Sequence, residues 1–482
     1  MRSDRGSEDR PNVVVVGGGI AGLTAAREVL LARPDVRVTV LEGAEQVGGK
    51  LRLGEIAGIP VDLGAESILN RRTEGTSLSR AVGLGEQLVH PATSGAGVWT
   101  RKAVRPLPPT LMGIPADLGV TARSGILSRA AVARARLERR LPRLDLTDDE
   151  GVGVLVARRL GHDVRDRLVE PLLGGVYAGR ADELSVHAAV PQLAAAVREH
   201  GGLLVAAKAM TEAGAGSQGP PQEGTPVFAG ISGGVGRLPI AVATDVEARG
   251  GQVRRDAFVR ELERSAHGWR LVVGPTSSPE VIETDAVIVA APATPAARLL
   301  RSAVPTAALE LGRVEYASMA IVTVAFRAAD VTVDLGGSGF LVPPVDGRVI
   351  KASTYSSRKW SWQTGDVFVI RCSVGRHRDE AELQRDDNEL VDAAVMDLRE
   401  ATGLHAPVLD AVVTRWGGAL PQYSVGHLDR VARIRAAVDL VPGLEVCGAV
   451  LDGVGIPAVI STGTRAATQV VDALVAGGRM SP

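Results

Sequence analysis

Residues 12–22 read NVVVVGGGIAG, and this stretch decides the fold. The run 13–16 is short, apolar and β-branched, which is typical of a buried strand in a parallel sheet. A GxGxxG pattern follows it, with its glycines at Gly17, Gly19 and Gly22. The first glycine permits a tight turn, the second lets a pyrophosphate approach the backbone, and the third lets the next helix pack closely on the strand.

A helical stretch and a second strand follow the glycines. The helix is expected from residue 23 to about residue 32, and the N–H groups at its start, around Ile20 and Ala21, favour phosphate. The strand 36–41 ends at Glu42, where a carboxylate accepts hydrogen bonds from ribose hydroxyls and disfavours a 2′-phosphate. The order of these parts predicts a dinucleotide site; the alternative is a structural Gly-rich turn.

Composition narrows the class of protein. The 482 residues are 45% hydrophobic and 23% charged, with a net charge of −1, so no global field recruits nucleic acid. The two cysteines, Cys372 and Cys447, are too few for a disulfide framework and fit a reducing compartment. The first ten residues are polar, expected to be disordered, and lack the apolar core of a signal peptide. We expect a cytoplasmic protein with no metal and no membrane-spanning segment.

Two segments after Glu42 separate FAD from NAD. Residues 46–50 read QVGGK, and residues 61–66 read VDLGAE. This pattern resembles the FAD-containing amine-oxidase superfamily, in which a GG-Lys/Arg turn and a DxGxE segment wrap the flavin end of FAD. Ordinary turns are the alternative. The resemblance implies non-covalent FAD bound by Gly49, Lys50, Gly64, Ala65 and Glu66.

The C-terminal region is expected to complete the cofactor site. A short strand, 444–447, precedes a Gly-rich turn, and a helix then runs from about residue 456 toward residue 474, which offers a second helix N-terminus to a ligand. The resemblance implies that this element contacts the flavin ring and ribityl chain, and that the backbone of Val259 contacts adenine. The cofactor contacts expected here are Gly448, Val454, Gly455 and Ile456.

The predicted fold class is α/β, with a discontinuous Rossmann-like FAD-binding domain, a mixed-sheet substrate domain and a helical insertion. The FAD-binding domain is expected over 10–85, 225–295 and 425–480, the substrate domain over 86–108, 191–224 and 296–424, and the helical domain over 109–190. Residues 211–225 are rich in Gly, Pro and Ser and are expected to form a flexible surface loop.

Further segments resemble the protoporphyrinogen/coproporphyrinogen oxidases of haem synthesis, in particular their Gram-positive, coproporphyrinogen-type branch. The segments are 170–185 (EPLLGGVYAGRADELS), 339–343 (GFLVP), 351–360 (KASTYSSRKW) and 415–427 (RWGGALPQYSVGH). They lie in the family's order along nearly the whole chain. The resemblance implies that the backbone of Gly175, Val176 and Tyr177 lies over the flavin beside the substrate, because a flat tetrapyrrole and a flavin must approach closely.

The implied activity is the six-electron oxidation of coproporphyrinogen III to coproporphyrin III, with O₂ as acceptor and H₂O₂ formed. Each two-electron step passes a hydride equivalent to the flavin, and pyrrole N–H protons leave to solvent or to backbone carbonyls near Gly175. Four propionates require cations at the rim of the pocket. The candidates are Arg71, Arg72, Lys351 and Arg358, with Tyr355 as a lining residue; each is otherwise a surface charge or a core residue.

Several alternatives stay open. The same chemistry on protoporphyrinogen IX is one, an amine oxidase or carotenoid desaturase is another, and a non-catalytic binding protein such as a GDP-dissociation inhibitor is a third. Residues 124–140 are expected to form a basic amphipathic helix, which suits a membrane surface; the alternative is a helix with one solvated face. Thr147 and Glu150 have capping-box spacing for a helix that ends at Gly161. We expect a protein between soluble and peripheral at the inner face of the cell membrane, with a ferrochelatase as a further partner and no particular oligomeric state predicted.

Overall fold

The computed structural model describes residues 10–93, 95–216 and 226–478 of the chain. The stretch expected to be disordered at the N-terminus therefore lies, except for its last residue, outside the described residues. The loop expected over 211–225 begins inside helix α10 (Leu203–Gly216), and the rest of it is outside as well.

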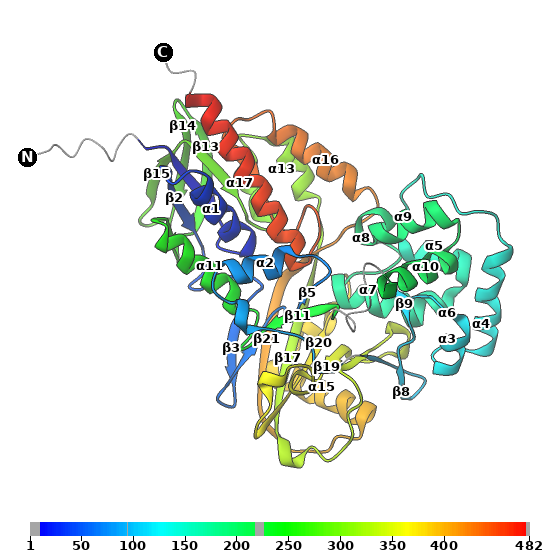
Figure 1. The fold of residues 1–482 in the computed structure, drawn as a ribbon. Coiled ribbons are helices and arrows are strands. Elements are labelled where there is room, and N and C mark those ends of the chain that lie inside the picture. Colours follow the sequence, from blue (N-terminus) through cyan, green and yellow to red (C-terminus); the bar gives the residue numbers. More distant parts are fainter. Residues whose placement is uncertain (1–9, 94, 217–225, 479–482) are drawn as a thin grey trace, which may run out of the picture.

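A five-stranded parallel sheet forms the centre of the first part of the molecule (Figure 1). Its strands come from distant parts of the chain, so the unit is assembled from separate segments. In sheet order they are β12 (Gln252–Arg254), β2 (Arg37–Leu41), β1 (Asn12–Val16), β16 (Ala286–Val289) and β22 (Leu444–Val446). Every neighbouring pair is parallel. The predicted α/β, Rossmann-like class is confirmed.

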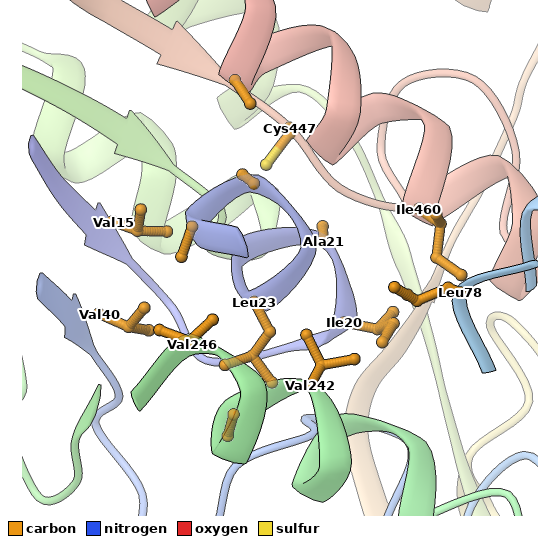
Figure 2. Packing of buried hydrophobic residues seen from close by; sticks show 14 of the residues in the cluster. Val15, Ile20, Ala21, Leu23, Val40, Leu78, Val242, Val246, Cys447 and Ile460 are labelled. Atoms are coloured by element: carbon orange, nitrogen blue, oxygen red, sulfur yellow. The ribbon is translucent and has the colours of Figure 1, made fainter. Parts of the chain in front are cut away.

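Helices cover one face of this sheet. Figure 2 shows Val15 and Val40 of the sheet packed against Leu23 of α1 (Ile20–Ala32) and against Val242 and Val246 of α11 (Arg237–Ala248). The long C-terminal helix α17 (Ile456–Gly478) lies beside α1, and α2 (Glu74–Ala81) closes the end of this core.

Glycines make the close approaches in this core possible. A Cβ on Gly22 would come within 2.0 Å of the Gly17 carbonyl oxygen, and a Cβ on Gly463 of α17 within 2.3 Å of the Ala21 carbonyl oxygen. Gly17 itself has φ +111°, in the region that L side chains rarely adopt. The backbone of α17 therefore lies directly against the backbone of α1 at Ala21, because Gly463 has no side chain at the contact.

The other face of the parallel sheet carries a second core. Val14, Val16, Val287 and Val289 alternate with the residues of the first core and point to this face. It is covered by an antiparallel sheet and three helices. These are β13 (Val259–Ser265), β14 (Gly268–Val273), β15 (Glu280–Thr284), α12 (Ala293–Leu300), α13 (Pro305–Gly312) and α16 (His427–Val438).

A seven-stranded mixed sheet forms the second part of the molecule. Its order is β21 (Val408–Pro421), β17 (Tyr316–Arg327), β20 (Val367–Val374), β19 (Ile350–Thr354), β18 (Gly339–Leu341), β7 (Gly97–Thr100) and β8 (Ala103–Pro106). Only β18 and β7 pair in parallel. One face packs on α15 (Asp387–Thr402), and the other meets the hairpin of β3 (Leu53–Ile56) and β4 (Ile59–Asp62). A small sheet of β5 (Ile68–Leu69), β11 (Phe228–Ile231) and β6 (Leu88–Val89) connects the two parts.

Helices form the third part, on the right of Figure 1. They share one hydrophobic core, to which α9 and α10 also belong, although the sequence analysis assigned 191–224 to the substrate domain. The helices are α3 (Leu118–Ser124), α4 (Arg129–Arg136), α5 (Val152–Leu160), α6 (His162–Val164), α7 (Glu170–Tyr177), α8 (Val186–Ala189), α9 (Pro191–His200) and α10. The strands β9 (Thr110–Leu111) and β10 (Ile114–Pro115) pack on α10. None of the helices among the described residues is long and apolar enough to cross a membrane.

Two local predictions in the helical part are wrong. The stretch 124–140 is not one helix, because Gly125 ends α3 in the left-handed conformation and the Ser128 hydroxyl caps a new helix by accepting from Ala131 N–H at 3.1 Å. The capping box at 147–150 does not form either, since α5 begins after Gly151. Glu150 is used instead in an ion pair with Arg158, 2.7 Å away. Gly161 ends α5, as predicted.

Candidate active site

The start of α1 is built to receive an anion. Gly19 occupies the N-cap position, and no side chain caps the helix. A Cβ placed on Gly19 would meet no atom within 4 Å, so there is open space in front of this helix N-terminus. Free N–H groups and the helix dipole favour a phosphate in such a place. The turn therefore fits the pyrophosphate of a dinucleotide.

Glu42 lies at the carboxyl end of β2, beside this turn. Its carboxylate accepts hydrogen bonds from the backbone N–H groups of Gly18 at 2.7 Å and Ala44 at 2.9 Å. The Glu42 carbonyl oxygen accepts from Ala257 N–H at 2.8 Å, which brings the chain near Val259 to the same edge. The predicted ribose and adenine contacts are thus neighbours in space.

The turn after Glu42 folds back onto the glycines. Gly48 N–H donates to the Gly18 carbonyl oxygen at 2.8 Å, and Gly49 adopts φ +58° next to Gly19. Lys50 follows; it has no carboxylate within 4.0 Å among the described residues, and burial lowers its pKa. A half-buried cation without an acidic partner among the described residues, next to this open glycine turn, is consistent with an anionic cofactor.

Residues 62–66 link this site to the seven-stranded sheet. The Asp62 carboxylate accepts from Val235 N–H at 2.9 Å and Gly236 N–H at 2.8 Å, and burial raises its pKa to about 6. The Trp416 indole N–H donates to the Leu63 carbonyl oxygen at 3.0 Å. A Cβ on Gly64 would lie 1.9 Å from the Lys50 carbonyl oxygen, so this segment packs against the GG-Lys turn without room for a side chain.

Glu66 is held by the second part of the molecule. Its carboxylate oxygens lie 2.6 Å from Lys359 Nζ and 2.6 Å from an Arg371 guanidinium nitrogen, and the Ser356 hydroxyl donates at 3.1 Å. Burial alone would raise the pKa of Glu66, but the neighbouring Lys359 and Arg371 charges lower it to about 2. The predicted cofactor residue therefore uses its carboxylate to join two parts of the protein.

Sequence reasoning missed Arg371 as the partner of Glu66. The sequence of β20, VFVIRCSV, places one arginine in an otherwise apolar strand, and such a buried charge requires a partner. The sequence therefore indicated that Arg371 has an acidic partner. It did not indicate which acid, because Glu66 is 305 positions away in the chain.

The turn before α17 is held by an aromatic pair. The Tyr423 hydroxyl donates to the Ala449 carbonyl oxygen at 2.6 Å and accepts from Gly453 N–H at 2.7 Å. The His427 ring stacks on Tyr423 with centroids 3.9 Å apart, and burial lowers the pKa of His427 to about 4, so the ring is neutral. The pair fixes the turn that contains Gly448, Val454 and Gly455, ahead of Ile456 at the start of α17.

Helix α7 exposes a glycine and a valine next to each other. Gly175 is exposed and Val176 is 43% exposed, although α7 packs on strands β18 and β19. A Cβ on Gly175 would touch only the Leu341 side chain, at 3.5 Å. The Tyr177 side chain instead points into the helical core, where its hydroxyl donates to the Ala189 carbonyl oxygen at 3.2 Å. Of the three residues predicted to lie beside the substrate, the first two are therefore at the surface, where Gly175 has no side chain and Val176 exposes an apolar one.

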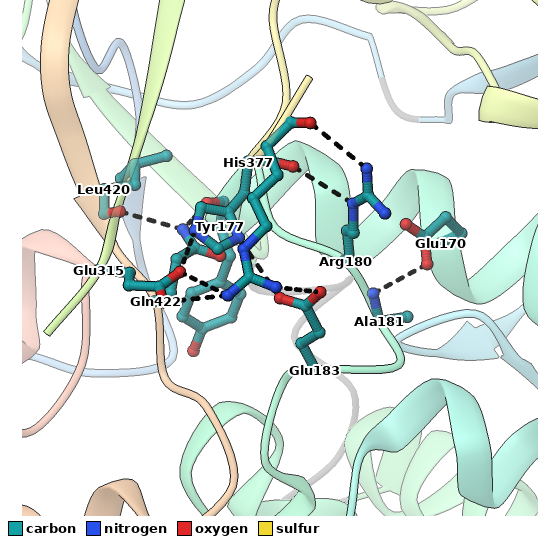
Figure 3. Close-up of polar contacts among 10 residues, drawn as sticks. Glu170, Tyr177, Arg180, Ala181, Glu183, Glu315, His377, Leu420 and Gln422 are labelled. Carbon is teal, nitrogen blue, oxygen red and sulfur yellow. Dashed lines mark hydrogen bonds and ion pairs between the residues drawn. The ribbon is translucent and has the colours of Figure 1, made fainter. Parts of the chain in front are cut away.

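A polar network fixes the C-terminal end of α7 (Figure 3). The Gln422 amide donates to the Tyr177 carbonyl oxygen at 2.8 Å, and His377 N–H donates to the Ala178 carbonyl oxygen at 2.7 Å. The His377 ring lies between Glu315 at 2.9 Å and Glu183 at 3.5 Å. The loop after β20 is therefore attached to the C-terminal end of α7, which fixes the position of α7 relative to the mixed sheet.

Only one of the five substrate candidates is a buried cation without an acidic partner. Arg72 pairs with Glu74, and Arg358 lies 3.5 Å from Asp334. Arg71 is exposed. The Tyr355 side chain lies in the core under α15, packed against Phe340, so it does not line a site on the opposite face of the sheet. Lys351 is 4% exposed and has no carboxylate within 4.0 Å in the part of the chain that the structure describes.

Comparisons with known proteins agree with this geometry. Residues 20–471 match the profile of the family described as flavin containing amine oxidoreductase. The chain is 38% identical over 471 residues to a coproporphyrinogen III oxidase of Mycobacterium tuberculosis, covering 95% of this chain and 97% of that protein. It is 30% identical over 468 residues to a coproporphyrinogen III oxidase of Bacillus subtilis, covering 95% and 98%.

A crystal structure of a candidate protoporphyrinogen oxidase from Exiguobacterium superposes with a TM-score of 0.83 at 29% identity, covering 96% of this chain and 99% of that one. The match therefore extends over the parallel sheet, the mixed sheet and the helical part together. The chain belongs to the flavin containing amine oxidoreductase family, in the group whose bacterial relatives are named coproporphyrinogen III oxidase.

Proposed function

We propose that this protein is an FAD-dependent oxidase that converts coproporphyrinogen III to coproporphyrin III in haem biosynthesis, with O₂ as the final acceptor and H₂O₂ as the by-product. The observation that carries the proposal is the open helix start at Gly19 together with the exposed Gly175 on α7, which packs next to the mixed sheet. The relatives' names support the choice of substrate.

The cofactor proposed here is FAD, bound without a covalent link. Its pyrophosphate is assigned to the N–H groups at Gly19, Ile20 and Ala21, its ribose to Glu42, and its adenine to the backbone at Val259. The isoalloxazine is assigned to the surfaces formed by Gly49, Lys50, Gly64 and Ala65 and by Gly448 to Ile456. When bound, the flavin supplies the hydride acceptor for the substrate.

The chain's own task is to position a large, flat, tetracarboxylate substrate. Gly175 has no side chain at the exposed surface of α7, so the macrocycle can approach its backbone without a steric block. The exposed Val176 side chain next to it offers an apolar contact. Gln422 and His377 hold the end of α7 and thereby fix the width of the site. We assign recognition of a substrate propionate to the exposed Arg71, since Arg72 and Arg358 already have acidic partners.

Anaerobic mixing with coproporphyrinogen III tests the function directly. We expect the visible flavin absorbance to bleach and to return when O₂ is admitted, with H₂O₂ detected by a peroxidase assay. Acid precipitation should release FAD into the supernatant, because no covalent link holds it. Protoporphyrinogen IX is the matched control. A faster bleach with that substrate, or a colourless protein that takes up no FAD, contradicts the proposal.

We also propose a peripheral contact with an anionic membrane surface through the segment 129–143. Leu137 and Leu141 are exposed there, and its only acidic residue, Glu138, is buried against Arg159. The same segment contains exposed arginines that have no acid within 4.0 Å among the described residues; they are Arg129, Arg136, Arg139 and Arg140. Basic residues near acidic lipid contribute about 1 kcal/mol each.

A vesicle flotation assay tests this contact. The protein is expected to float with phosphatidylglycerol vesicles and to stay behind with phosphatidylcholine vesicles. A variant with Arg136, Arg139 and Arg140 changed to Gln should lose flotation and keep its oxidase rate, because these side chains lie on the surface of the helical part. Equal flotation of the variant and the wild type would refute the contact.

A further inference from the structure

Lys351 occupies an unusual position in the mixed sheet. It is the bulged residue of β19, between the pairs Ile350–Val374 and Ala352–Ser373. Its side chain is 4% exposed, and the contact recorded for Nζ is the Met319 sulfur at 4.0 Å. A buried ammonium group without a carboxylate is costly, so a buried lysine of this kind tends toward the neutral amine.

The groups around Lys351 do not compensate a positive charge. Arg376, in the loop after β20, adds a second cation. Arg371 on β20 is already paired with Glu66. Glu170 on α7 accepts from Ala181 N–H at 2.8 Å, and Asp397 on α15 accepts from the N–H groups of Val349 and Ile350. Burial, with a smaller contribution from Arg376, lowers the pKa of Lys351 to about 7.

The position of Lys351 places it beside the proposed substrate surface. Helix α7 packs on β18 and β19, and Gly175 faces Leu341 of β18. The next residue, Val342, donates its N–H to the Lys351 carbonyl oxygen at 2.8 Å. Successive side chains of a strand point to opposite faces of the sheet. Ala320 of β17 points to the face that packs on α15, so its neighbour Met319 points to the other face. The Lys351 amine contacts Met319 and therefore also lies on the face opposite α15.

We propose that Lys351 accepts the pyrrole proton during porphyrinogen oxidation. This inference rests on the function proposed above. Each of the three two-electron steps removes a hydride from a methylene bridge together with one proton, and a double bond forms in the macrocycle. Of the three protons, two come from pyrrole N–H groups and one comes from the fourth methylene bridge. The hydride goes to the flavin, and the proton goes to the lone pair of the Lys351 amine, which becomes an ammonium. That ammonium returns the proton to water before the next step, so one amine serves all three.

Two substitutions separate this role from a simple charge contact. Lys351→Arg keeps a positive charge but cannot take up a proton near neutral pH. Lys351→Met keeps the length of the side chain and removes both charge and basicity. Lys208→Met is the matched control, because Lys208 is exposed on α10 and its nearest acid is Glu212 at 3.7 Å.

The primary measurement is the anaerobic rate of flavin bleaching by coproporphyrinogen III between about pH 6 and about pH 9. The wild-type rate should rise with pH and level off above an inflection near the amine pKa of about 7. Both Lys351 variants should be slower by about 100-fold and should lose the inflection, since general-base contributions are of this order. Lys208→Met should follow the wild type.

Two further readouts do not depend on turnover. The FAD content from the visible spectrum should be unchanged in all variants, and the Kd for the product coproporphyrin III should stay within about threefold of the wild-type value in Lys351→Met. If Lys351→Arg reacts at the wild-type rate with the same pH profile, Lys351 is not the proton acceptor. If Lys351→Met binds the product much more weakly while Lys351→Arg binds it normally, Lys351 is a carboxylate contact and the inference is overturned. If the wild-type flavin does not bleach at all, the proposed function itself fails and this inference fails with it.

Discussion

Replacing Gly19 with alanine is expected to leave the fold intact and to abolish tight FAD binding. The added methyl group meets no protein atom within 4 Å, and Gly19 has φ −71°, which any L residue adopts. In the proposed complex, however, the same space holds the pyrophosphate. A methyl group there prevents close approach of the phosphate to the backbone N–H groups.

The loss of affinity for FAD should be about 100-fold or more, which corresponds to about 3 kcal/mol. Equilibrium titration of the apoprotein with FAD measures it, and circular dichroism with thermal unfolding of the apoprotein checks the fold. Gly336→Ala is the matched control, because a Cβ on Gly336 also meets nothing within 4 Å and lies in the substrate part of the chain. If Gly19→Ala binds FAD as tightly as the wild type, the pyrophosphate does not bind at this turn.

Replacing Glu66 with glutamine is expected to destabilise the protein by about 3–5 kcal/mol, because it leaves two buried cations without their acid. Arg371 and Glu66 are 8% and 12% exposed at their side chains, and Lys359 is 15% exposed. Chemical denaturation followed by tryptophan fluorescence measures the change. Glu280→Gln, in the solvated pair with Arg254, is the control and should cost less than about 1 kcal/mol.

The same cluster gives a pH dependence with a definite sign. The pKa of Glu66 is about 2 in the folded protein, below the ordinary value of 4.5, so the folded state binds the proton more weakly than the unfolded chain. The stabilisation is fully present above about pH 4.5 and is lost as the pH falls toward 2. Acid unfolding of Glu66→Gln should therefore show a shallower slope in this window. A Glu66→Gln protein as stable as the wild type, with the same acid profile, would show that the cluster does not hold the two parts together.

Much of the cofactor site follows from local sequence. The glycines at 17, 19 and 22, the apolar strand before them and Glu42 after them are close in the chain, and their spacing alone specifies a strand, a turn and a helix start. The same holds for the turn at Gly49 and Lys50. These predictions concern short-range backbone geometry, which a few neighbouring residues determine.

Side-chain partners over long distances did not follow from the sequence. The capping box at Thr147 and Glu150 had the right spacing, yet Glu150 pairs with Arg158 and α5 begins later. The first N–H groups of α5 donate to carbonyl oxygens of the segment 181–184, and such tertiary contacts outweigh a local cap worth about 1 kcal/mol. Tyr355 was predicted as a residue that lines the substrate site, with a core position as the alternative, and the register of β18 and β19 brings it into the core under α15.

By itself, then, the sequence determined the α/β class, the flavin family and the place of the glycine turn to which we assign the pyrophosphate, because these depend on residue types at fixed short spacings. Only the tertiary structure decided that Glu66 joins two parts of the molecule, that Arg72 and Arg358 are already paired, and that Lys351 is buried without an acid. The physical reason is that charge compensation and burial depend on which distant strands become neighbours, and strand order in a sheet is not encoded in any local pattern.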